Sequence, residues 1–169
     1  MKRIAITMAI AAGLAASMAA APAIASGKDE AAIRALEARF AAAFNAKDLD
    51  AIMKVYVPDE SLLVFDVVPP RQYAGADAYR KDWQDLLGLF PGPLKFEISD
   101  LHVFAAGRLG YGYSIQHLSG ADAKGQTIDL TVRVTDAYRK IKGHWLVVHE
   151  HVSVPVDLAT GKPDLASKP

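Results

Sequence analysis

The stretch that decides the fold is Gln126–Val156, which reads QTIDLTVRVTDAYRKIKGHWLVVHEHVSVPV. From Gln126 to Tyr138 the side chains alternate between apolar and polar with period two, which is typical of a half-buried strand. The pair Lys142-Gly143 separates this run from a second one. The sequence therefore predicts a β-hairpin with strands over Gln126–Ile141 and His144–Val156.

Two carboxylates interrupt the apolar faces of this hairpin, Asp136 on the first strand and Glu150 on the second. A charge among buried apolar groups is unfavourable unless it is paired or neutralised. We therefore expect a polar site inside an apolar cavity. The apolar residues that alternation places on the same faces are Ile128, Leu130, Val132, Val134 and Tyr138, and Leu146, Val148, Val152 and Val154.

The residues before the hairpin predict three helices, a short strand and two longer strands. Apolar residues at three- and four-residue spacing indicate the first helix, Asp48 is suited to cap the second, and Pro69-Pro70 ends the short strand. This order predicts an α+β fold in which a curved antiparallel sheet packs against three N-terminal helices. The expected helices are Lys28–Ala46, Leu49–Val55 and Ala76–Leu89, and the expected strands are Leu62–Val67, Leu94–Ala105 and Leu109–Leu118.

The N-terminus predicts an export signal. Lys2 and Arg3 precede an apolar, Ala-rich run, and Ala23-Ile24-Ala25 fits a cleavage site, so residues 1–25 are expected to be a signal peptide. We expect a bacterial periplasmic or secreted protein with one domain over residues 26–156 and a loose tail over 157–169; a retained membrane anchor is the alternative. Without Lys2 and Arg3 the chain has 17 basic and 19 acidic residues, a net charge of −2, so nucleic acid is not an expected partner.

Two segments carry a resemblance to a known family. Residues 39–50 read RFAAAFNAKDLD, and residues 140–153 contain Lys-x-x-Gly-x-Trp-x-x-x-His-x-His-x-Ser. With the order of elements, they resemble the nuclear transport factor 2-like superfamily, which includes SnoaL-type polyketide cyclases, ketosteroid isomerase, scytalone dehydratase and the association domain of calmodulin-dependent kinase. The resemblance implies a cone-shaped fold with an internal cavity, and its members include enzymes, scaffolds and binding proteins.

The resemblance to ketosteroid isomerase implies two catalytic residues. Asp66 falls where that family has its general base. Asp136 begins Asp-x-aromatic-Arg, the segment that supplies a protonated hydrogen-bond donor. Where the family has an oxyanion tyrosine, this chain has Phe40. The alternatives are that Asp136 pairs with Arg139 or Arg133, and that Asp66 caps a turn.

Phe40 and four further residues are expected to line the pocket. Tyr56, Trp83 and Tyr113 offer an apolar body with a polar tip, and Glu150 either faces the pocket or pairs at a subunit interface. His149 and His151 share the opposite face by alternation. They are therefore expected on the outer surface rather than at a metal, unless a bulge turns both inward.

These observations lead to one principal hypothesis. The chain is an acid–base isomerase, dehydratase or cyclase that needs no cofactor or metal and acts on a small hydrophobic carbonyl compound. The alternatives are a non-catalytic binding protein and a scaffold that uses Trp145, His149 and His151 on the outer face of the sheet. A homodimer is expected.

Overall fold

The computed structural model describes residues 27–167, so the expected signal peptide lies outside the described residues. Within this range no helix is both long and apolar enough to cross a bilayer. The helices are α1 (Gly27–Asn45), α2 (Leu49–Met53) and α3 (Ala76–Gly88), and the strands are β1 (Leu63–Phe65), β2 (Tyr73–Ala74), β3 (Lys95–Ala106), β4 (Leu109–Ala121), β5 (Thr127–Ile141) and β6 (His144–Ser153).

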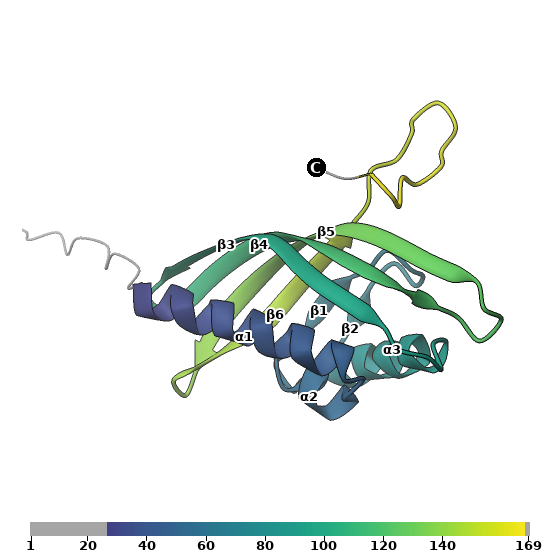
Figure 1. The fold of residues 1–169 in the computed structure, drawn as a ribbon. Helices are drawn as coiled ribbons and strands as arrows, with labels where there is room; N and C mark the ends of the chain where they lie inside the picture. Colours follow the sequence, from purple (N-terminus) through teal and green to yellow (C-terminus); the bar gives the residue numbers. More distant parts are fainter. Residues whose placement is uncertain (1–26, 168–169) are drawn as a thin grey trace, which may run out of the picture.

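The strands form one curved sheet in the order β2-β1-β6-β5-β4-β3. Helix α1 lies along the concave side of the sheet, and α2 and α3 lie near the end that holds β1 and β2 (Figure 1). The expected α+β architecture is confirmed. One pairing differs from the expectation of a fully antiparallel sheet: β1 runs parallel to β6.

The apolar stripe of α1 closes the concave face. Its residues Ile33, Leu36, Phe40 and Phe44 are at most 4% exposed. Phe40 and Phe44 pack against Phe96 of β3 and Trp83 of α3. Burial of this apolar stripe, which the residue spacing predicts, therefore holds α1 against the sheet.

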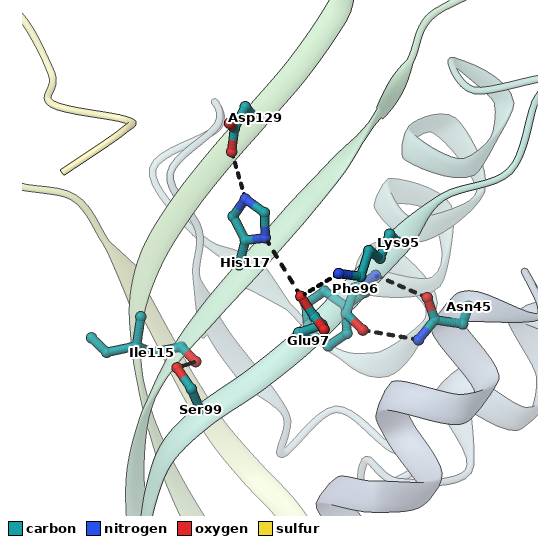
Figure 2. Close-up of polar contacts among 8 residues, drawn as sticks. All are labelled: Asn45, Lys95, Phe96, Glu97, Ser99, Ile115, His117 and Asp129. Atoms are coloured by element: carbon teal, nitrogen blue, oxygen red, sulfur yellow. Dashed lines mark hydrogen bonds and ion pairs between the residues drawn. The ribbon is translucent and has the colours of Figure 1, made fainter. Parts of the chain in front are cut away.

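Asn45 at the end of α1 joins the helix to the edge strand β3 (Figure 2). Its Nδ2 donates to the backbone oxygen of Phe96 at 2.9 Å, and its Oδ1 accepts from the backbone N–H of Phe96 at 2.8 Å. Immediately afterwards, Asp48 caps α2 by accepting from the backbone N–H of Ala51, as its position predicts.

A β-bulge changes the expected face pattern of the second hairpin strand. Ala137 pairs with His149 and Tyr138 pairs with Val147, so Val148 is the extra residue on β6. The bulge reverses the alternation on its hairpin side. Trp145 and Val147 are buried there, and the prediction that Leu146 and Val148 face inward with Glu150 is wrong.

Two further segments make pairings that the sequence pattern does not indicate. Strand β2 extends the sheet by pairing antiparallel with β1. In the described part of the tail, the backbone N–H of Thr131 donates to the oxygen of Leu165 at 2.8 Å, and Val156 forms a bridge with Pro163.

Candidate functional site

A cavity of about 80 Å³ lies between α1, α3 and the sheet. Its aromatic wall consists of Phe40, Tyr79, Trp83 and Phe96, and its two acidic residues are Asp66 and Glu150. Gln116 adds a polar side chain. The remaining lining residues are Val67, Leu86, Leu118, Leu130, Val132 and Val152.

Glu150 is the buried acid of this cavity, with 6% of its surface exposed. The hydroxyls of Tyr56 and Tyr79 donate to its Oε2 and Oε1 at 2.9 and 2.5 Å. Burial raises the pKa of Glu150 to about 7, although both tyrosine hydroxyls favour the carboxylate. Glu150 is thus near half-protonation at neutral pH, which suits a group that exchanges protons.

Asp66 reaches the same cavity because of the register of β1. Val64 pairs with Glu150 on the parallel strand β6, and Asp66 lies two residues beyond Val64. Alternation therefore directs Asp66 to the side on which Glu150 lies. Its Oδ1 accepts from the backbone N–H of Val67 at 2.5 Å, and burial raises its pKa. The Asp66 side chain is half-buried, whereas the Glu150 side chain is buried.

Asp136 lies directly opposite Glu150 on β5 and is 3% exposed. It is not among the residues that line the cavity. Burial and the neighbouring carboxyls of Glu150 and Glu37 raise its pKa well above the usual range, so the neutral acid is favoured. None of the ion pairs between described residues involves Asp136, and its Oδ1 lacks a hydrogen-bond partner within residues 27–167.

Glu37 of α1 is a buried acid that the sequence analysis missed. Its Oε1 accepts from the hydroxyl of Tyr138 at 2.9 Å, and the same hydroxyl lies 3.4 Å from Oδ2 of Asp136. Burial raises the pKa of Glu37 to about 7. A signal was available, because Glu37 lies four residues after Ile33 and three before Phe40, on the apolar stripe.

Of the other residues expected in the pocket, some lie at the cavity and others do not. Phe40 and Trp83 line the cavity, and Tyr56 lies behind it and holds Glu150. The expectation that Tyr113 lines the pocket is wrong. Tyr113 is 44% exposed and stacks on His102 at 4.9 Å between ring centroids, because its strand position points away from the helices.

His149 and His151 lie away from the cavity. His149 Nδ1 is 2.8 Å from the backbone oxygen of Leu63, and both rings contact Phe65 edge-to-face. The bulge at Val148 turns Trp145 inward instead, so its expected place on the outer face is wrong.

A second group of titratable residues spans three strands on an exposed part of the sheet (Figure 2). His117 of β4 lies 2.5 Å from Asp129 of β5 and 4.0 Å from Glu97 of β3. Among the described residues no group of three or more His, Cys, Asp or Glu side chains has an arrangement that could hold a metal ion.

Comparisons with known proteins agree with this fold. Residues 33–157 match the SnoaL-like domain family. A nuclear transport factor 2-like protein from Pseudomonas putida KT2440 is 33% identical, with a TM-score of 0.77 over 86% of this chain and 99% of that chain. A search of curated proteins finds no significant match.

Two more distant solved structures share the fold. A ketosteroid isomerase-like protein from Erwinia carotovora atroseptica is 18% identical, with a TM-score of 0.64 over 76% of this chain and 97% of that chain. A proposed dehydratase from Streptomyces avermitilis is 13% identical, with a TM-score of 0.65 over 75% and 96%.

Proposed function

The chain belongs to the SnoaL-like domain family, and from that premise we propose that it is a cofactor-free acid–base catalyst that moves a proton next to the carbonyl group of a small hydrophobic compound. The observation that carries the proposal is the pairing of two unlike carboxyls on one largely apolar cavity. Asp66 is half-buried and Glu150 is buried. The two carboxyl groups therefore differ in exposure to solvent, and acid–base catalysis requires an acid and a base in such unlike environments.

The proposed chemistry begins with enolisation. The carboxylate of Asp66 takes a proton from the carbon beside the carbonyl, and the carboxylic acid of Glu150 donates its proton to the carbonyl oxygen. In a β,γ-unsaturated carbonyl compound the product of this step is a dienol; Asp66 then returns its proton to the γ-carbon and Glu150 recovers its own from the enol hydroxyl, which moves the double bond next to the carbonyl group. In a dehydration, the proton of Glu150 instead leaves with a β-hydroxyl group as water.

The surrounding residues have supporting roles in this proposal. Tyr56 and Tyr79 fix the orientation of the Glu150 carboxyl, and the neutral Asp136 faces it from β5. The sequence hypothesis paired Asp66 with Asp136. We assign the second role to Glu150 because Glu150 lines the cavity and Asp136 does not.

The test is exchange of carbonyl-adjacent protons in D₂O. The protein is incubated with a panel of small ketones and aldehydes, and loss of the ¹H NMR signal is followed. We expect exchange above the buffer rate, and Glu150→Gln and Asp66→Asn each lower it by about 10²–10⁴-fold. Glu60→Gln removes an exposed carboxylate and serves as the matched control. Full activity in Glu150→Gln would refute the assignment.

The same cavity bears on the alternative of a non-catalytic binding protein. A carrier of apolar metabolites is expected to have at most one charged group in its pocket, whereas two carboxyls line this cavity. The scaffold alternative relied on an outer-face Trp145, which is 4% exposed. Both observations favour the catalyst.

We further propose that the protein is exported with cleavage after Ala25 and forms a homodimer. The exposed rings of Phe104, Tyr111 and Tyr113 on the outer face support the dimer. Intact mass spectrometry of the secreted protein tests the cleavage, with Ser26 as the expected first residue. Sedimentation velocity tests the dimer, and a monomer at micromolar concentration would refute it.

A further inference from the structure

We propose that the cavity takes a compact, uncharged carbonyl compound of about the size of butanone, and that it rejects carboxylates and ligands that carry an aromatic ring. This inference concerns the substrate class of the cavity and rests on the proposed function for the identity of the site. Size, charge and one unpartnered hydrogen-bond donor support it independently.

The cavity is small for a ligand that carries an aromatic ring. The cavity measures about 80 Å³, and an engineered apolar protein cavity of about 150 Å³ is known to accommodate benzene. The space here is about half as large. The rings of Phe40, Tyr79, Trp83 and Phe96 occupy the positions that a larger ligand would need, and they are at most 7% exposed. These rings contact one another edge-to-face, tilted or through Phe44, so one cannot shift without displacing its neighbours.

The titratable groups in and behind the cavity wall are acidic. Asp66 and Glu150 contribute acidic groups to the wall, and Asp136 and Glu37 lie behind it. Among the described residues that line the cavity there is no Lys, Arg or His. An anionic ligand would lose its hydration without gaining a cation, and it would be repelled by any ionised carboxyl nearby. A neutral ligand avoids both penalties.

The cavity wall also contains a buried hydrogen-bond donor that has no acceptor among the described residues. Trp83 is 6% exposed and lines the cavity, and its indole Nε1 has no hydrogen-bond partner within residues 27–167. Buried donors in native proteins are nearly always paired. A ligand oxygen would supply the acceptor that Trp83 lacks, so the ligand class is one that carries an oxygen.

Three small compounds with the same branched arrangement of non-hydrogen atoms separate the effect of hydrogen bonding from the effect of charge. They are butanone, propionate and 2-methyl-1-butene, which present a ketone, a carboxylate and a hydrocarbon. Binding is measured at pH 7 by ligand-observed NMR, which does not require turnover. We expect butanone to bind at least 10-fold more tightly than propionate, and 4-phenyl-2-butanone, which has the same ketone with an added ring, to bind at least 10-fold more weakly than butanone.

Single substitutions test how hydrogen bonding, charge and cavity size each contribute to ligand binding. Trp83→Phe keeps a ring and removes the N–H, so we expect weaker binding of butanone and unchanged binding of 2-methyl-1-butene. At pH 8, where Glu150 is mostly ionised, Glu150→Gln should narrow the preference for butanone over propionate by up to about 10-fold. Leu86→Ala removes a half-buried wall residue of α3 and should admit 4-phenyl-2-butanone, while Glu60→Gln should leave all affinities unchanged.

The outcomes distinguish this inference from the proposed function. If the binding order holds but no proton exchange occurs, the catalytic proposal fails and the ligand class stands. If exchange occurs but propionate or 4-phenyl-2-butanone binds to the wild-type protein as tightly as butanone, the ligand class is wrong and the catalytic proposal stands. Failure of butanone to bind at millimolar concentration would also overturn the inference.

Discussion

Replacing Glu37 by Gln is expected to remove a large part of the pH dependence of the protein's stability. In the folded state burial raises the pKa of Glu37 from 4.5 to about 7, so the folded protein holds a proton there that the unfolded chain releases. Stability from this group is therefore complete below pH 4.5 and is lost as the pH rises through 7. Each pKa unit corresponds to about 1.4 kcal/mol, so the loss over the whole rise is about 3.5 kcal/mol.

The titratable groups in contact with Glu37 affect how much of the pH dependence of stability comes from Glu37 alone. Tyr138 donates a hydrogen bond to it, and Asp136 shares that hydroxyl from the opposite side. Gln keeps the acceptor for Tyr138 and cannot ionise. We therefore expect Glu37→Gln to gain about 2.5 kcal/mol relative to the wild type between pH 5 and pH 8, with little difference in the hydrogen bond itself.

Urea unfolding at pH 5, 6, 7 and 8 measures this directly. The buried residues Trp83 and Trp145 provide the fluorescence signal. Glu60→Gln removes an exposed carboxylate and is the control. If Glu37→Gln and the wild type lose stability in parallel between pH 5 and pH 8, Glu37 does not titrate as a buried acid and the reasoning fails.

Three further substitutions test the fold and the limits of the site. Asn45→Ala should lower the free energy of unfolding in urea by about 2 kcal/mol, because two hydrogen bonds to Phe96 are lost; an effect below about 0.5 kcal/mol would contradict this. Gly112→Ala should lower the free energy of unfolding by about 1–3 kcal/mol, because a Cβ there would lie 3.0 Å from the hydroxyl of Tyr138. Gly88→Ala is the control: a Cβ there would meet open space, so it should be neutral or stabilising in the same assay. Tyr113→Ala should leave butanone binding unchanged in the NMR assay, and a loss of binding would place this exposed residue at the site.

Much of the fold was predictable because it depends on local periodicity. The alternation over residues 127–138 placed Val132, Val134 and Asp136 on the buried face, and the structure buries all three. The bulge at Val148 was not predictable, since an extra strand residue leaves no compositional mark there. The structure therefore buries Trp145, which alternation alone placed outside.

The candidate site was predictable only in part. Sequence reasoning singled out Asp66 and Glu150 one at a time, and neither residue type nor spacing indicates that β1 runs parallel to β6 and brings the two acids to one cavity. Glu37 was overlooked because an acidic residue on a helix is usually solvated. Its burial follows from the packing of α1 beneath the sheet.

By itself the sequence determined which residues prefer strand or helix and that acidic groups interrupt apolar faces, because these properties depend on neighbours along the chain. Only the tertiary structure decided which acids share a cavity, how large that cavity is and which residues remain in water. These properties depend on strand register, on one bulge and on the packing of α1 and α3 against the sheet, which bring together residues that lie far apart in the sequence.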